Sequence, residues 1–166
     1  MCSNQHSIAV KNRTEYLCCS KNKLFIYFFF AIFKYKFQEM KSANAKNILV
    51  VDDSTTNIVL LEAILDEKGY KIYTALNVKE AYSIIAKHHP DLILLDLLMP
   101  KISGFDFLKE IKKNKYTKDT PVIIVSALAD DENIDRILSM GAIDFVKKPI
   151  DLQYLVNKVE SILHEQ

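Results

Sequence analysis

Cysteine is scarce in this sequence, and its few copies are confined to one end. The three cysteines are Cys2, Cys18 and Cys19, and the rest of the chain has none. That long remainder therefore holds neither a disulfide framework nor the thiolate ligands of a structural zinc site. Such cysteine usage is typical of proteins in a reducing compartment, so we expect a cytoplasmic location.

A long apolar run is also missing. The longest run, Leu24 to Phe33 (LFIYFFFAIF), has about half of the roughly 20 residues that a membrane-spanning helix needs. No small-residue cleavage site follows this run, as one would in a signal peptide. The sequence thus lacks the full pattern of a transmembrane helix and that of a secretory leader.

The apolar run and its flanking lysines leave three interpretations open. One is a short membrane-surface anchor, since aromatic residues and lysine suit a membrane interface; another is a packing segment. The third is that the segment is not part of the working protein, because an A/T-rich untranslated region would encode its Lys, Asn, Phe, Tyr and Ile. We favour the third, with Met40 as the start. We predict a basic, aromatic extension at residues 1–45, disordered or not native, and one domain at residues 46–166.

Basic charge is in short supply outside this extension. The first 46 residues hold 8 of the 22 Lys and Arg residues but only 2 of the 21 Asp and Glu residues. Residues 47–166 are left with 14 basic and 19 acidic residues, a formal charge of −5. Because phosphate backbones are bound by clustered Lys and Arg, we expect no direct nucleic-acid binding by this part.

From residue 47 onward, short apolar runs alternate with amphipathic segments. We expect strands at 48–51, 71–75, 92–95, 122–125 and 142–146, and helices at 55–68, from 78, at 104–114, at 131–140 and from 152. Strands that alternate with helices form a parallel sheet with right-handed crossovers, and strands buried on both faces are apolar throughout. The sequence therefore predicts an α/β domain: a doubly wound, five-stranded parallel sheet with five helices in three layers.

The second predicted helix has the clearest start signal. Asn77 precedes it, and Glu80 lies three residues further on, which is the capping-box arrangement. Val78, Ala81, Tyr82 and Ile85 follow at helical spacing as its apolar stripe. Asp151 is the expected cap of the last helix.

Polar side chains follow four of the five predicted strands. Asp52 and Asp53 follow the first strand, Asp96 the third, Ser126 the fourth and Lys148 the fifth. Sites in open parallel sheets lie outside the carboxyl ends of the strands, so these groups are expected to converge. Three adjacent carboxylates repel one another unless a cation is present, and Mg²⁺ suits oxygen ligands while leaving room for phosphate.

Each of these residues also has a simpler interpretation when it is taken alone. Asp53 would serve as a helix cap, Ser126 as a turn residue and Lys148 as a solvated surface lysine. Their joint placement at four strand ends favours a functional site instead.

Four segments of the sequence resemble the motifs of one known family, the response-regulator receiver domain. They are ILVVDDS (48–54), DLILLDLLMPKISGFD (91–106), VIIVSA (122–127) and FVKKP (145–149). The resemblance covers about residues 46–165. It implies a flavodoxin-like sheet with the strand order 2-1-3-4-5.

The resemblance also implies how the acidic residues act. Asp96 would accept a phosphoryl group from a sensor histidine kinase or a histidine phosphotransfer protein. Asp53, Asp96 and the backbone carbonyl of Leu98 would bind Mg²⁺ directly, with Asp52 acting mostly through water. Polar residues that orient the hydrolytic water in the family are replaced here by Leu98 and Leu128, which predicts slow self-dephosphorylation.

Other residues take their expected roles from the same resemblance. Lys148 would pair with a phosphoryl oxygen, and Ser126 with the Ala127 backbone N–H would hold another. Ser126 and Phe145 would form the conformational switch, and Pro149 lies at the family's cis peptide site.

The sequence ends within the last predicted helix, with no output domain after it. We therefore predict a single-domain regulator or a phosphorelay intermediate, not an enzyme. The face formed by 131–140, 142–146 and the last helix would bind a downstream protein or a second copy. Two alternatives remain: a receiver that no longer accepts phosphate, and a flavodoxin-like cofactor binder. The first is disfavoured by the intact acidic, hydroxyl and lysine residues, and the second because Asp52 and Asp53 would repel a cofactor phosphate.

Overall fold

The computed structural model describes residues 45–100, 103–128 and 130–164. They form five strands and five helices. The strands are β1 (Asn47–Val51), β2 (Lys71–Ala75), β3 (Leu92–Leu95), β4 (Val122–Ser126) and β5 (Asp144–Lys147). The helices are α2 (Thr55–Glu67), α3 (Val78–His88), α4 (Gly104–Lys113), α5 (Asp131–Ser139) and α6 (Leu152–His164). The predicted extension at 1–45 lies, except for its last residue, outside the described residues.

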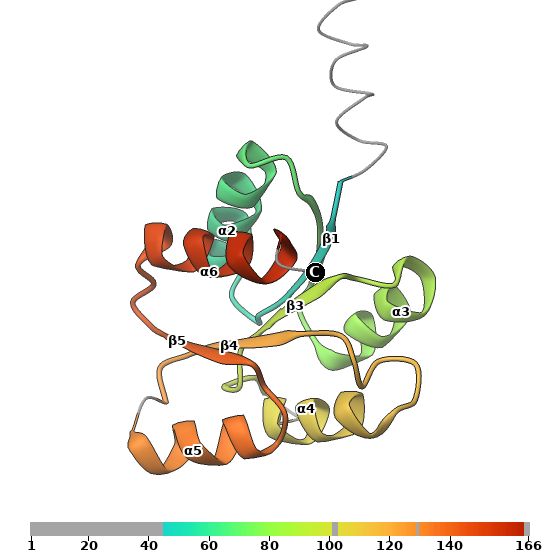
Figure 1. The fold of residues 1–166 in the computed structure, drawn as a ribbon, viewed down its shortest axis with the longest axis vertical. Helices are drawn as coiled ribbons and strands as arrows, with labels where there is room; N and C mark the ends of the chain where they lie inside the picture. The colour runs from blue at the N-terminus through green and yellow to red at the C-terminus, as the bar shows by residue number, and fades with distance from the viewer. Residues whose placement is uncertain (1–44, 101–102, 129, 165–166) are drawn as a thin grey trace, which may run out of the picture. The chain divides into compact units, whose positions relative to one another are not determined.

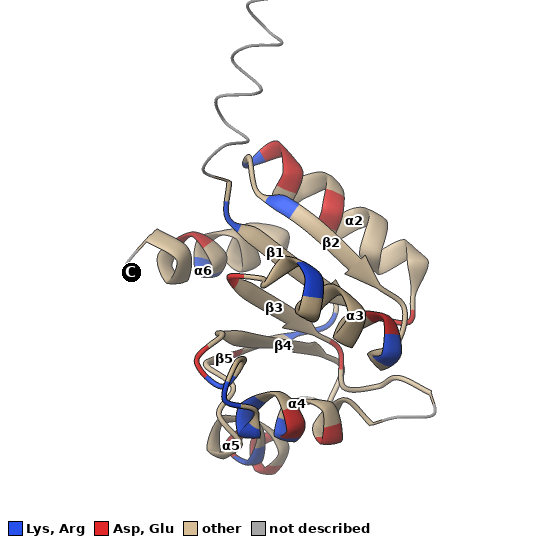
Figure 2. Ribbon diagram, turned by 90° about the vertical axis from the view of Figure 1, so that its right-hand side faces the viewer, with Lys and Arg blue, Asp and Glu red and all other residues tan. Residues whose placement is uncertain are grey.

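The five strands form one parallel sheet in the order β2-β1-β3-β4-β5, which confirms the predicted fold class. Helices α2 and α6 cover one face of the sheet, and α3, α4 and α5 cover the other (Figure 1). The strands β3 and β4 carry no charged residue along their lengths (Figure 2). Both of their faces are buried, because a helix layer packs on each.

Alternating side chains of the strands supply two separate hydrophobic cores. Leu49, Val51, Leu95 and Ile124 pack toward α3, α4 and α5, whereas Val50 and its even-numbered β1 and β3 partners pack toward α2 and α6. This alternation is the two-residue period of a strand. It also decides which face each residue just beyond a strand end turns toward.

The cap of α3 is the one that the sequence predicted, but the assignment of Tyr82 to the apolar stripe of this helix is only partly right. The Asn77 side chain accepts a hydrogen bond from the Glu80 N–H at 3.0 Å, and Glu80 reaches back to the Leu76 N–H. Tyr82, predicted on the buried stripe, is 39% exposed: its ring meets Phe107 edge-on and its hydroxyl donates to Glu110. A tyrosine at the margin of an apolar stripe can keep its hydroxyl in a polar contact while its ring packs.

The fifth strand begins two residues later than predicted. The Ala142 N–H still donates to the Ile137 carbonyl, so this residue completes the turn that ends α5. The preceding Gly141 has a φ of +99°, which a residue with a side chain adopts only with strain. Pairing with β4 therefore starts at Asp144, opposite Ile123.

None of the helices in these described ranges is both long enough and apolar enough to cross a membrane.

Gly104 allows α4 to begin against the loop that follows β3. A Cβ atom at this position would lie 2.5 Å from the Asp96 carbonyl oxygen and 2.5 Å from the Leu97 Cα. Both atoms belong to the backbone, which cannot move aside as a flexible side chain can. The absence of a side chain at Gly104 thus sets the position of the segment that carries Asp96.

We predict that Gly104→Ala lowers the free energy of unfolding by about 1–3 kcal/mol, the usual effect of overpacking. Urea denaturation measures the change. Gly69→Ala is the control: a Cβ there has open space, so its loss of about 1–2 kcal/mol comes from the positive φ alone. Only the Gly104 variant should also weaken Mg²⁺ binding. Wild-type stability and binding in Gly104→Ala would contradict this account.

Candidate functional site

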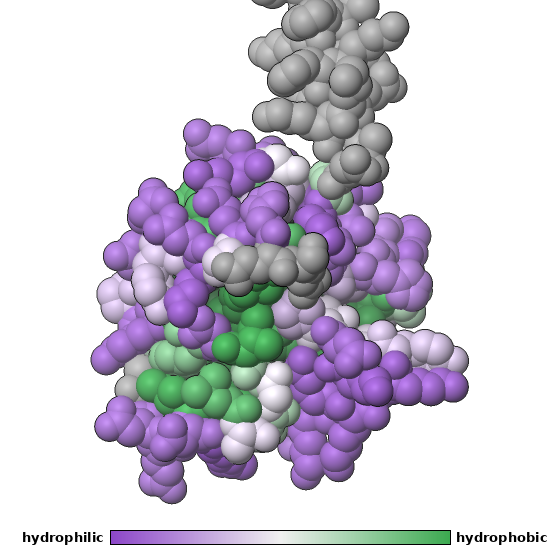
Figure 3. Space-filling model, in the orientation of Figure 1, coloured by the Kyte–Doolittle hydropathy of each residue, from purple (hydrophilic) through white to green (hydrophobic). Residues whose placement is uncertain are grey.

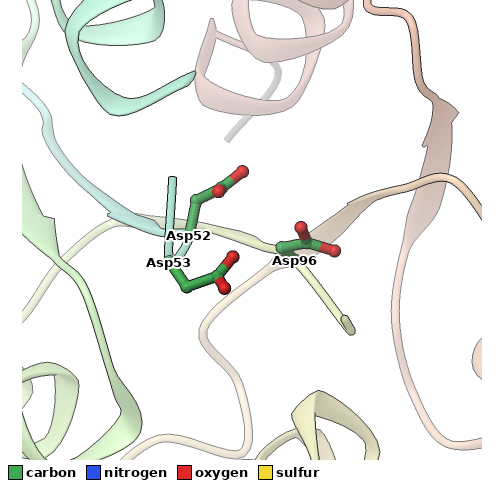
Figure 4. Close-up of side chains that lie close together, drawn as sticks. All are labelled: Asp52, Asp53 and Asp96. Atoms are coloured by element: carbon green, nitrogen blue, oxygen red, sulfur yellow. The ribbon is translucent and has the colours of Figure 1, made fainter. Parts of the chain in front are cut away.

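Three carboxylates meet at the carboxyl edge of the sheet. Asp52 and Asp53 follow β1 directly, and Asp96 follows β3 (Figure 4). One oxygen from each of the three lies within 4.8 Å of the others. The convergence that the strand ends predicted is therefore present in the fold.

Backbone pairing fixes this convergence. In the register of β1 and β3, Val51 lies opposite Leu95, so the next residues, Asp52 and Asp96, emerge side by side. The Asp96 N–H donates to the Val51 carbonyl at 2.9 Å, and the Asp52 N–H donates to the Ala75 carbonyl of β2 at 3.2 Å. The ladder thus continues to the site.

Lys148 joins two of the carboxylates. Its Nζ lies 2.7 Å from Asp52 Oδ2 and 2.5 Å from Asp96 Oδ2. Asp52 is only 2% exposed and Asp96 5% exposed, so both need partners that replace water. Lys148 is held by its own N–H, which donates to the Ser126 carbonyl, and its peptide bond to Pro149 is cis, as the resemblance implied.

The electrostatics of the site keep Lys148 charged. Burial lowers the pKa of this lysine, but its hydrogen bonds to Asp52 and Asp96 and the charges of the two carboxylates outweigh that effect. The net result is a pKa above the ordinary value. Lys148 therefore stays an ammonium at neutral pH, where it offsets part of the acidic charge.

The other carboxylate oxygens are held by nearby donors. Asp52 Oδ1 accepts from the Ser54 N–H at 2.8 Å, and Asp96 Oδ1 accepts from the Leu98 N–H at 2.9 Å. The Asn57 amide donates to both oxygens of Asp52. No described residue donates a hydrogen bond to the Asp53 carboxylate, which is exposed.

Asn57 is the site residue that the sequence motifs missed. It is the third residue of α2, which starts just after the acidic pair. A polar residue in the first turn of a helix that begins beside a buried aspartate is the signal that points to it. This signal is weak, because Asn in a first turn is common without such a partner.

The predicted switch residues continue the rows of the sheet that face α3, α4 and α5. Ser126 ends β4, is fully buried, and its Oγ accepts from the Leu128 N–H at 3.5 Å. It continues the alternation of Val122 and Ile124, which face α3, α4 and α5. The half-buried Phe145 packs against the same core. Ser126 and Phe145 therefore both face the α5 side.

Two predicted residues lie at the exposed rim. Leu98 is 49% exposed, and Ala127, which follows β4, is also exposed. Leu128 is half-buried. Leu98 lies two residues after Asp96 and Leu128 two residues after Ser126, and neither side chain carries a polar atom.

The donor set fits a hard divalent cation. Three carboxylates with one exposed member offer the oxygen ligands that Mg²⁺ prefers, and the open side leaves room for water. Asp53 is available as a direct ligand, whereas Asp52 is already surrounded by donors. This difference agrees with the predicted division between direct and water-mediated contacts, which stays a prediction.

Comparison with known proteins places the chain in a family. A model of the response regulator receiver domain matches residues 48–160. The chain is 33% identical over 118 residues to the phosphate regulon transcriptional regulatory protein PhoB of Pseudomonas aeruginosa, covering 71% of this chain and 52% of PhoB. It is 42% identical over 117 residues to the response regulator PleD of Caulobacter vibrioides, covering 69% of this chain and 25% of PleD.

A solved structure gives the same result. A two-component response regulator from Clostridium difficile superimposes with a TM-score of 0.68 at 31% identity, covering 72% of this chain and 96% of that one. The chain therefore belongs to the response regulator receiver domain family of two-component signalling. Phosphorylation of an aspartate and binding of Mg²⁺ are general features of this family. The chain spans about half of PhoB and a quarter of PleD.

We predict that Lys148→Met lowers the free energy of unfolding by about 1–3 kcal/mol in Mg²⁺-free buffer, because two buried carboxylates lose a hydrogen-bonded partner. The domain should remain folded, since domains are stable by about 5–15 kcal/mol. Added Mg²⁺ should restore part of the loss. Chemical denaturation with and without Mg²⁺ measures both effects.

Lys158→Met is the matched control, because its ammonium pairs with the more exposed Asp144. Such a pair contributes about 0–1 kcal/mol and should not respond to Mg²⁺. Equal losses in the two variants, both insensitive to Mg²⁺, would contradict the role of Lys148 in the acidic cluster.

Proposed function

We propose that this chain is a phosphoacceptor switch that receives a phosphoryl group on Asp96. The observation that carries the proposal is the bridge of Lys148 between Asp96 and Asp52, with the exposed Asp53 beside it. This arrangement puts one fixed cation and one open acidic ligand next to the buried carboxylate of Asp96. A purely structural ion pair would not need the third carboxylate, whose charge repels the other two.

The chemistry needs charge compensation more than proton transfer. An oxygen of Asp96 attacks phosphorus, the new O–P bond forms, and the P–N bond to the donor histidine breaks with its electron pair returning to nitrogen. Both reactants are anionic, so positioning and positive charge lower the barrier. Asp53, Asp96 and the Leu98 carbonyl would hold a Mg²⁺ ion, with Asp52 acting through water, and the ion would supply positive charge that offsets the phosphoryl oxygens.

Lys148 changes partner in this proposal. Its ammonium turns from Asp96 and Asp52 to a phosphoryl oxygen, while the Ser126 hydroxyl and the Ala127 N–H hold another. The pKa of Lys148 lies above its ordinary value, so the ammonium is present for this contact. Charge-assisted hydrogen bonds of this kind are about twice as strong as neutral ones.

The signal leaves the site through Ser126 and Phe145. Movement of the hydroxyl toward the phosphoryl group frees space on the α5 side, and the Phe145 ring follows inward. Turning a mostly inactive population into a mostly active one takes about 5.5 kcal/mol of differential binding. Phe145 lacks a hydroxyl, so its two positions differ in packing more than in hydrogen bonding.

The face formed by α5, β5 and α6 is the proposed output surface. Apolar side chains gather on the side of the molecule that carries these elements (Figure 3). Leu138 of α5 and Ile143, which directly precedes β5, are exposed apolar residues of this part of the chain. A downstream protein, or a second copy of the chain, would bind this face after the switch. The donor would be a sensor histidine kinase or a histidine phosphotransfer protein, and this domain would pass the signal on by protein–protein contact or phosphotransfer in the cytoplasm, without binding nucleic acid itself.

We predict that Asp96→Asn abolishes phosphoryl incorporation, because an amide is a poor nucleophile and a poor metal ligand. The protein is incubated with Mg²⁺ and phosphoramidate, and intact mass is measured for the gain of one phosphoryl group. Asp106→Asn, an exposed aspartate on α4, is the control and should incorporate as the wild type does. Stoichiometric labelling of the Asp96→Asn protein would refute the assignment.

We also predict that the aspartyl phosphate is long-lived. Hydrolysis needs a water aligned opposite the leaving carboxylate, and neither Leu98 nor Leu128 can hydrogen-bond to it. Leu98→Asn combined with Leu128→Glu should speed decay, within the roughly 10²–10⁴-fold range of positioned acid–base help. The decay of labelled protein at fixed Mg²⁺ is followed for both forms. Fast decay of the wild type, or no acceleration in the double variant, would show that the leucines do not set the lifetime.

A further inference from the structure

The Asn57 side chain spans the carboxylate of Asp52. Its amide nitrogen lies 3.2 Å from Oδ1 and 2.9 Å from Oδ2. Asn57 is half-buried in the first turn of α2, on the same side of the sheet as Asp52. The contact therefore joins a helix of the α2–α6 layer to the acidic cluster.

Donors of two kinds surround Asp52. The Ser54 N–H at Oδ1 and the Asn57 amide come from the segment that follows Asp52 and serve no other carboxylate. The Lys148 ammonium at Oδ2 is shared with Asp96 and comes from the other end of the domain. Oδ2 thus has one local donor, Asn57, and one that also serves Asp96.

The proposed function makes this difference matter. If Lys148 turns to a phosphoryl oxygen, Asp52 Oδ2 loses its ammonium partner while the carboxylate stays 2% exposed. A buried charged acceptor left without a donor is strongly unfavourable. Any cost at Asp52 would oppose the transfer of Lys148 to the phosphoryl group.

We propose that Asn57 is a positioning residue that holds Asp52 in place when Lys148 turns to the phosphoryl group. The inference rests on the proposed function and deepens it. Before phosphorylation the two donors share Oδ2; afterwards the amide is the side-chain donor that remains on that oxygen and keeps its carboxylate oriented.

The chemistry of asparagine suits this task. An amide donates without adding charge, so it neither competes with Lys148 for the phosphoryl group nor repels a divalent cation. A carboxylate at this position would add a fourth negative charge to the cluster, and an apolar side chain would supply no donor. Residue 57 is fixed by the helix that it belongs to, so its amide does not need to move between the two states.

The test separates two affinities in the full chain. Mg²⁺ binding to the unphosphorylated protein is measured by calorimetry. Binding of the phosphoryl mimic beryllofluoride at saturating Mg²⁺ is followed by fluorine NMR, since the chain has no tryptophan for a fluorescence signal. Circular dichroism checks that each variant is folded.

Asn57→Leu, of similar size but without a donor, should lower the affinity for beryllofluoride by roughly 10–100-fold, the equivalent of one lost charge-assisted hydrogen bond. Its Mg²⁺ affinity should change by less than about threefold, because Lys148 still holds Asp52 before the mimic binds. Asn57→Gln keeps an amide donor on a longer stem and should recover part of the loss. Asn47→Ala, which removes a half-buried amide at the opposite end of β1, should change neither affinity.

Each other outcome overturns the inference in an identifiable way. Equal losses in both affinities would make Asn57 a general structural residue, and no loss in either would show that Asp52 needs no second donor. If Asn57→Leu does not fold, Asn57→Gln carries the test, and equal losses there would have the same meaning. If the wild type fails to bind beryllofluoride, the proposed function fails, and the inference falls with it.

Discussion

The site depends on one contact: the Lys148 ammonium is shared by two buried carboxylates, those of Asp52 and Asp96. Asp52 and Asp96 are almost fully buried, so a negative charge on either would strongly destabilise the fold without a partner. Lys148 pairs with both. The reach is demanding, because β4 separates β5 from β3 and each strand adds about 4.8 Å. A four-carbon stem that ends in a compact charge can span that separation, which is why the cation comes from the edge of the sheet.

The sheet makes this contact possible through strand alternation. Even-numbered residues of β1 and β3, and Val146 of β5, face α2 and α6. Asp52, Asp96 and Lys148 continue these rows and meet through the Lys148 ammonium, and Asn57 contacts Asp52. Ser126 and Phe145 continue the other rows and face α5. A slip of one residue in any of these strands would move its polar group to the wrong face. The register that buries the core therefore also assembles the site.

The sequence predicted the five strands, the polar residues at their carboxyl ends and the layer architecture, because apolar periodicity and strand-end chemistry are local; the ends of β4 and β5 lie one residue later than predicted. It predicted burial, side-chain orientation and strand bounds less well wherever these depend on a contact between distant segments. The sequence DD does not tell which aspartate is buried; the structure buries Asp52 and exposes Asp53. Tyr82 fits a helical stripe, yet the carboxylate of Glu110 on another helix draws its hydroxyl outward. The late start of β5 depends on a hydrogen bond back to α5. Asn57 could not be singled out, because its partner is a side chain whose orientation no motif specifies.

The charge balance at the sheet edge argues that the cluster is retained for chemistry. Three carboxylates and one ammonium, which contacts two of them, meet here, so the described site carries a formal excess of two negative charges. Replacing a buried ion pair by well-packed apolar residues is often neutral or stabilising, so stability alone would not keep such a group. In the proposed function, the excess charge attracts a divalent cation, and the cation offsets the negative charge of the phosphoryl group. The donors around Asp52 then have a definite purpose: they keep one carboxylate fixed while the ammonium and the remaining acidic oxygens are free to change partners.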